Sequence, residues 1–121
     1  MPELSFTGEA PAIHNLVIRN NRFINIDGCS INLGCFKSDN SYDNKNILIE
    51  GNTFENYGAS GGVGIAGIQG TAVLIRNADG VIIRNNIFKP AATTAPAGAK
   101  PVVVEVSRNV KFENNNGIDN K

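Results

Sequence analysis

A nine-residue pattern occurs four times in this chain, at residues 15–23, 46–54, 80–88 and 109–117. Successive copies begin 31, 34 and 29 residues apart, so the repeating unit is about 30 residues long. Self-similarity at such a period is typical of solenoids, in which each unit covers the open face of its neighbour. The repeat therefore restricts the chain to folds built by stacking.

Each copy of the pattern begins with alternating apolar residues and continues to an asparagine. In the second copy the apolar residues are Ile47 and Ile49 and the asparagine is Asn52. Alternation with a period of two predicts a short strand that buries one face. Asparagine tolerates left-handed backbone and its amide both donates and accepts hydrogen bonds, so a turn is expected there. The equivalent asparagines are Asn21, Asn52, Asn86 and Asn115.

Stacked copies would align these asparagines at the strand spacing of about 4.8 Å, which predicts an asparagine ladder. Phe23, Phe54 and Phe88 follow two residues later and are expected to stack inside the coil. Further strands are predicted at residues 30–33, within 64–75 and at 101–106. With no helical period present, the sequence predicts an all-β fold: a right-handed parallel β-helix of about four three-sided coils.

The motif Asn-Ile-x-Ile-x-x-Asn-x-Phe at residues 46–54 resembles the parallel β-helix repeat of the pectate-lyase-like superfamily. The resemblance extends over most of residues 15–117, and residues 46–88 are similar to the terminal coils of bacterial α-1,3-galactosidases. It implies a β-helix from a group that includes polysaccharide lyases, polygalacturonase-type hydrolases, epimerases and phage tailspikes. It transfers no catalytic residue, because the Gly-His-Gly, Asp-Asp and Arg-x-Lys signatures and the calcium-binding aspartate cluster are missing from the sequence.

Length and charge narrow the classes of partner. The 121 residues suit one domain, and the 11 basic side chains balance the 11 acidic ones, which gives no electrostatic case for binding nucleic acid or an anionic membrane. Neither a signal-peptide pattern nor an apolar run of about 20 residues is visible. The compartment stays open, although the resemblance implies a secreted or periplasmic parent. We expect residues 1–121 to form a single β-helix domain that is part of a longer β-helix or self-associates through open coil ends.

One outward-facing row of the predicted strands alternates in charge: Arg19, Glu50, Arg84 and Glu113. The favoured interpretation is a surface ion-pair ladder that orders the coils. The alternative is a glycan-binding face on which the arginines hold substrate hydroxyl or carboxylate groups. Glu50 and Glu113 would lie about 10 Å apart with Arg84 between them, which is wide for a hydrolytic pair.

A second candidate cluster, Asp39, Tyr42 and Asp43, precedes the second copy of the pattern. A tyrosine beside carboxylates is typical of sugar sites, and two aspartates could ligate calcium, but the spacing matches no calcium loop and an ordinary polar turn has the same composition. We therefore predict no metal and no cofactor. The candidate substrate-binding residues are Asp39, Tyr42, Asp43, Arg19, Glu50 and Arg84.

A third outward row consists of Val17, Leu48 and Ile82, with Lys111 in the last copy. Three stacked apolar side chains would form an exposed strip unless further coils or another copy of the chain covered them.

The sequence thus favours the β-helix portion of a protein that binds or processes polysaccharides or glycans, as a scaffold with a glycan groove. Whether it is an enzyme stays open; a glycoside hydrolase or polysaccharide lyase would have its catalytic residues outside this chain. The alternatives are a non-catalytic β-helix module for binding or assembly, and a complete glycosidase or lyase within these residues.

Overall fold

A computed structural model describes residues 4–6, 13–26, 29–33, 42–57, 70–90 and 100–120. These residues contain strands and no helix. The strands are β1 (Leu4–Phe6), β2 (His14–Arg19), β3 (Arg22–Ile26), β4 (Ile31–Leu33), β5 (Asn44–Glu50), β6 (Thr53–Tyr57), β7 (Val73–Arg76), β8 (Ala78–Arg84), β9 (Ile87–Lys89), β10 (Val102–Glu105) and β11 (Arg108–Glu113).

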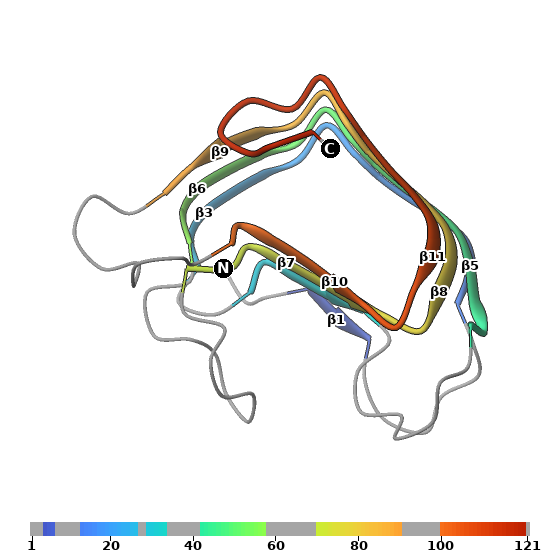
Figure 1. Ribbon diagram of the computed structural model, residues 1–121. Coiled ribbons are helices and arrows are strands. Elements are labelled where there is room, and N and C mark those ends of the chain that lie inside the picture. Colours follow the sequence, from blue (N-terminus) through green and yellow to red (C-terminus); the bar gives the residue numbers. More distant parts are fainter. Residues whose placement is uncertain are drawn as a thin grey trace.

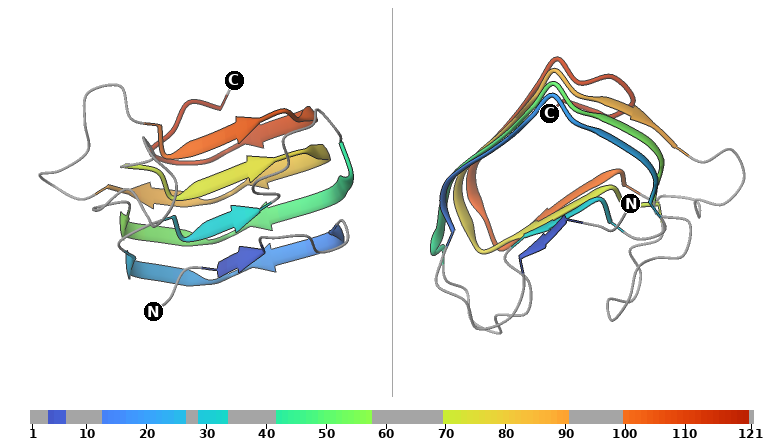
Figure 2. Two further views of the ribbon diagram at one scale, coloured as in Figure 1. Left: turned by 90° about the horizontal axis from the view of Figure 1, so that it is seen from below. Right: turned by 180° about the vertical axis from the view of Figure 1, so that it is seen from behind.

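The strands form three parallel sheets that make the three sides of a solenoid (Figure 1). Sheet A has the order β1-β4-β7-β10, sheet B the order β11-β8-β5-β2, and sheet C the order β3-β6-β9. From β2 onward the chain runs through sheets B, C and A in turn, and each circuit is stacked on the one before it (Figure 2). Its turns are right-handed, as parallel crossovers almost always are. The predicted parallel β-helix is confirmed.

The third strand of each circuit forms close to the predicted segments. Residues 30–33 contain β4, residues 64–75 contain most of β7, and residues 101–106 contain β10. In sheet A the outward Asn32 and Leu74 are only 4% and 2% exposed, so both faces of this sheet are buried around its middle strands. Cys29 is buried against Leu74, and Cys35 lies outside the described residues.

The core occupies the inside of the coil because equivalent positions of successive repeats pair in register. The rings of Phe23 and Phe54 stack with centroids 5.1 Å apart and an interplanar angle of 6°. Phe54 and Phe88 follow at 4.8 Å and 10°. Aromatic pairs of this kind add about 0.5–1.5 kcal/mol each to the burial of their area. The predicted phenylalanine stack is confirmed.

The asparagine ladder is also present and buried. Both the backbone N–H and the Nδ2 of Asn52 donate to Asn86 Oδ1, at 2.9 and 3.2 Å. The backbone and side chain of Asn86 donate in the same way to Asn115 Oδ1, both at 3.0 Å. Beyond the last coil the row ends on Asn120, whose Oδ1 accepts from the N and Nδ2 of Asn115 at 2.9 and 2.8 Å. Asn120 thereby accepts the two hydrogen bonds that a ladder asparagine of a further coil would accept.

The left-handed turn, however, is one residue earlier than the sequence suggested. The residues with positive φ are Asn20 (58°), Gly51 (67°), Asn85 (56°) and Asn114 (53°), each preceding a ladder asparagine. The ladder residue keeps negative φ because its N–H and amide must both point along the stack to the next coil. Because the bend is at the preceding residue, the backbone N–H and the side-chain amide of the ladder asparagine can both point to the next coil.

A second left-handed position lies at the corner between sheets A and B. There Asn77 has a φ of 58° and Val106, its equivalent in the next coil, has a φ of 47°. Asparagine adopts this conformation readily, whereas a β-branched residue is strained in it. Val106 is therefore a point of stored strain.

Candidate functional site

The outer face of sheet B carries three outward rows that run along the stack in register. We call them the edge row, the aliphatic row and the charge row, in the direction of the strands. The edge row is His14, Lys45, Asp79 and Arg108; the aliphatic row is Val17, Leu48, Ile82 and Lys111; the charge row is Arg19, Glu50, Arg84 and Glu113.

The charge row forms two of the ion pairs that the sequence predicted, both at Glu50, whereas Arg84 and Glu113 in the described structure make no ion pair with each other. Glu50 Oε2 lies 3.4 Å from Arg19 Nε, and Glu50 Oε1 lies 3.3 Å from Arg84 Nε. The two oxygens of one carboxylate are thus divided between the coil below and the coil above. This geometry suits Glu50 to holding the two guanidinium groups in place, and it leaves their other N–H groups for a ligand.

The aliphatic row lies between the two polar rows. Val17 is 52% exposed, while Leu48 and Ile82 are half-buried by their neighbours. Their side chains repeat at the strand spacing of about 4.8 Å on a backbone fixed by hydrogen bonds on both sides. Together they make a narrow, rigid apolar strip that ends at the exposed Lys111.

The edge row contains a polar cluster around Asp79. Arg108 Nε donates to Asp79 Oδ2 at 3.1 Å, and Asn109 Nδ2 donates to Asp79 Oδ1 at 2.7 Å. The Asn109 hydrogen bond, followed by the hydrogen bond and charge of Arg108, holds the pKa of Asp79 below its ordinary value. The Arg108 guanidinium carbon also lies 4.4 Å from the centroid of the Tyr42 ring, within cation–π range.

The structure separates the predicted site residues into two groups. Arg19, Glu50 and Arg84 contact one another at the carboxyl end of sheet B. Tyr42 and Asp43 lie at the opposite end, just before β5, where the Asp43 carbonyl oxygen is 3.1 Å from His14 Nε2. The strand between the groups spans about 20 Å. Asp39, the remaining candidate, lies outside the described residues.

Sequence reasoning missed the cluster of Asp79, Arg108 and Asn109 as a candidate site. The signal was present, because Lys45, Asp79 and Arg108 occupy equivalent positions and alternate in charge just as the charge row does. What the repeat could not supply was the position of Tyr42, which precedes β5 and still reaches a guanidinium of β11.

No group of three or more histidine, cysteine, aspartate or glutamate side chains among the described residues could hold a metal ion. No helix in this part of the chain is long and apolar enough to span a bilayer.

Comparison with protein-family models, with curated proteins and with solved structures finds no match for this chain. The outer face of sheet B therefore has to be interpreted from its own chemistry.

Proposed function

We propose that the chain is the β-helix portion of a carbohydrate-active protein of the pectate-lyase-like type, and that the outer face of sheet B is its glycan-binding surface. The observation that carries the proposal is the in-register strip of Val17, Leu48 and Ile82 with a row of charged groups on each side. Sugars present the same combination, since each ring has an apolar C–H face bordered by hydroxyl groups.

The spacing of the rows supports this proposal. The charge row lies two residues along the strands from the aliphatic row, or about 6.6 Å, so a ring lying on the strip has its hydroxyl or carboxylate groups within reach of the guanidinium groups. Arg19 and Arg84 each direct one nitrogen to Glu50 and have further N–H donors for the ligand. On the other side of the strip Arg108 and the Tyr42 ring offer a second set of contacts.

The test is binding of the purified 121-residue chain to a panel of soluble polysaccharides, including neutral galactans and polygalacturonate, measured by affinity electrophoresis and calorimetry. Val17→Asp places a charge at the most exposed position of the strip and should weaken binding by about tenfold, the effect of roughly 1.4 kcal/mol. Ile87→Asp is the matched control, because Ile87 is 38% exposed and lies on sheet C. The proposal fails if no glycan binds, or if both variants weaken binding equally.

A non-catalytic β-helix module for binding or assembly is the second candidate. It is favoured by the engagement of Glu50, Glu55 and Asp79 in ion pairs, which occupies these carboxylates structurally. Release of new reducing ends or of unsaturated uronate products separates the two candidates. Binding without turnover by the chain is expected from both, whereas turnover restored by adding further coils of the same protein supports the carbohydrate-active enzyme alone.

A further inference from the structure

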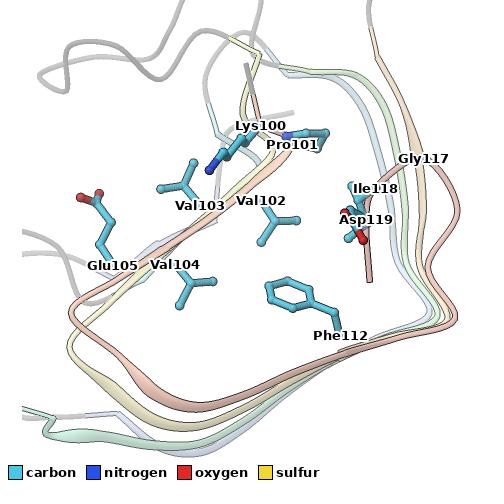
Figure 3. Close-up of a pocket in the computed structure, with 10 residues that line it drawn as sticks. All are labelled: Lys100, Pro101, Val102, Val103, Val104, Glu105, Phe112, Gly117, Ile118 and Asp119. Atoms are coloured by element: carbon cyan, nitrogen blue, oxygen red, sulfur yellow. The ribbon is translucent and has the colours of Figure 1, made fainter. Parts of the chain in front are cut away.

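The two ends of the coil stack differ in how well they cover the core. At the amino-terminal end, Ile18 and Phe23 are only 5% and 6% exposed. In the last coil, the inward-facing Val102, Val104 and Phe112 are only half-buried. Between them a hollow of about 750 Å³ is bounded by β10, β11 and residues 117–119, and Figure 3 shows these three side chains directed into it.

Strand β10 forms the open edge of sheet A at this end, since among the described strands it pairs only with β7. The Pro101 carbonyl accepts a hydrogen bond from Val73 on the β7 side, at 3.1 Å. Because the backbone groups of a strand alternate in direction, the N–H and C=O groups of Val102 and Val104 then face the open side. Residues 102–104 are three valines, so the charged side chain of this edge strand, Glu105, lies at its end and leaves the middle unprotected.

A second copy stacked head to tail does not fit this edge. Such a copy would place its Asn21 on Asn115 to continue the ladder, and Asn120 already accepts both hydrogen bonds of Asn115 there. In the edge row it would place His14 next to Arg108, which offers it no opposite charge. In the charge row Glu113 would lie next to Arg19, which is a favourable pair. The segment after β11 therefore blocks parallel continuation while leaving β10 accessible.

We infer that β10 is a self-association edge, which pairs in antiparallel fashion with β10 of a second copy about a two-fold axis through Val103. In this register Val102 lies opposite the partner's Val104, and both residues present their backbone groups to each other. The axis is perpendicular to sheet A, so the inward valines of both copies face the same side and cover the two hollows. An interface of this kind closes at two copies.

The charges at the two ends of β10 favour this arrangement. Lys100 precedes the strand and Glu105 is its last residue, and both are exposed. In this register Glu105 of each copy lies opposite Pro101 of the other, next to Lys100, so the two opposite charges come near each other twice across the pair. For β11, the register that sets Val110 opposite the partner's Phe112 is opposed, because it places Lys111 against Lys111.

The first measurement is the mass of the 121-residue chain in solution by sedimentation equilibrium, with a dimer at twice 12.9 kDa as the expected result. Val104→Pro removes an N–H on the open side without removing one that β7 uses, so it should yield folded monomer, verified by circular dichroism. Lys100→Glu and Glu105→Lys should each raise the dimer dissociation constant by about tenfold, and combining the two should restore it.

Each other outcome overturns the inference. A monomer at all concentrations means that β10 does not pair with itself. A dimer that withstands Val104→Pro and both charge reversals uses another surface. Open-ended assemblies indicate head-to-tail stacking. If Val104→Pro fails to fold, the single and combined variants Lys100→Glu and Glu105→Lys still test the inference.

Discussion

Replacing Asn86 with alanine tests whether the ladder stabilises the fold as the hydrogen bonds indicate. Asn86 Oδ1 accepts from the N and Nδ2 of Asn52, and Asn86 Nδ2 donates to the Ile49 carbonyl at 3.1 Å and to Asn115 Oδ1 at 3.0 Å. The substitution leaves the buried N–H of Asn52 and the buried carbonyl of Ile49 without these partners. Each of the two orphaned groups costs about 1–3 kcal/mol, so we expect a loss of about 2–6 kcal/mol, the lower value applying if water enters.

Asn21→Ala is the matched control, because it changes the same residue type in the same row at the exposed end of the stack. The hydrogen bonds of the Asn21 side chain are donations to Asn52 Oδ1 and to the Arg19 carbonyl, at 3.2 and 3.0 Å. Asn52 Oδ1 retains the backbone donor of residue 21, at 2.9 Å, after the change. We expect a loss below about 1 kcal/mol.

The assay is urea unfolding of both variants and the parent, followed by circular dichroism and compared at equal m-values. A larger loss of stability for Asn86→Ala, in the buried part of the ladder, than for Asn21→Ala, at its exposed end, supports the burial argument. The reasoning is refuted if Asn21→Ala destabilises as much as Asn86→Ala, or if the latter costs less than about 1 kcal/mol.

Four further predictions use the same unfolding assay. Phe54→Ala should cost about 3–5 kcal/mol because the ring is stacked on both faces, whereas Ile87→Ala on the surface should cost below about 0.5 kcal/mol; similar values would contradict the stack. Val106→Asn should raise the free energy of unfolding by about 1 kcal/mol, because asparagine adopts positive φ with less strain than valine. If Val106→Asn instead lowered stability as much as Val106→Ala does, strain at this residue would not be the reason. The buried Tyr57 hydroxyl has no hydrogen-bond partner among the described residues, so Tyr57→Phe should keep or raise stability by about 1 kcal/mol. Since burial raises the pKa of Tyr57 to about 12, the parent should lose stability between pH 10 and 12, more steeply than this variant. The pKa of Asp79 is lowered, so its stabilisation is complete above the ordinary value of 3.8 and is lost as pH falls through the folded-state value; Asp79→Asn should flatten the acid limb of a stability profile.

The sequence predicted the core well because the core depends on the repeat alone. Ile49, Asn52 and Phe54 sit at fixed offsets within one nine-residue pattern, and their equivalents pair in register in the structure. A constant offset fixes both which side chains face inward and which equivalents touch. The ladder and the ring stack followed from that offset without knowledge of any loop.

The left-handed turn was assigned to the wrong residue for a reason visible in the sequence. In the first, third and fourth copies asparagines are adjacent, at Asn20-Asn21, Asn85-Asn86 and Asn114-Asn115, and either one suits a turn or a ladder. Only Gly51, before Asn52, distinguishes the two positions, because glycine favours positive φ and cannot supply an amide. One glycine among four copies was the available evidence.

The outer face was only partly predictable. The ion pairs of Arg19, Glu50 and Arg84 followed from strand alternation, since outward positions of adjacent coils are neighbours. The contact of Tyr42 with Arg108 did not, because it depends on the path of the chain before β5. Residues outside the repeat have no equivalent in other coils from which a register could be inferred.

This difference between the two ends of sheet B bears on how such a face would select a ligand. The corner from sheet B to sheet C has the same length in every coil, because the ladder asparagine fixes it, so the charge row repeats regularly. The connection into sheet B does not: ten residues separate β4 from β5, but one separates β7 from β8 and two separate β10 from β11. The charge row alternates arginine and glutamate from coil to coil, so under the proposed function it would repeat the same contacts every second coil and supply affinity with little selectivity. At the irregular end Arg108 lies against the Tyr42 ring and pairs with Asp79, a contact that no other coil repeats among the described residues. If this face binds glycans as we propose, discrimination among them would belong to the edge row and general affinity to the charge row.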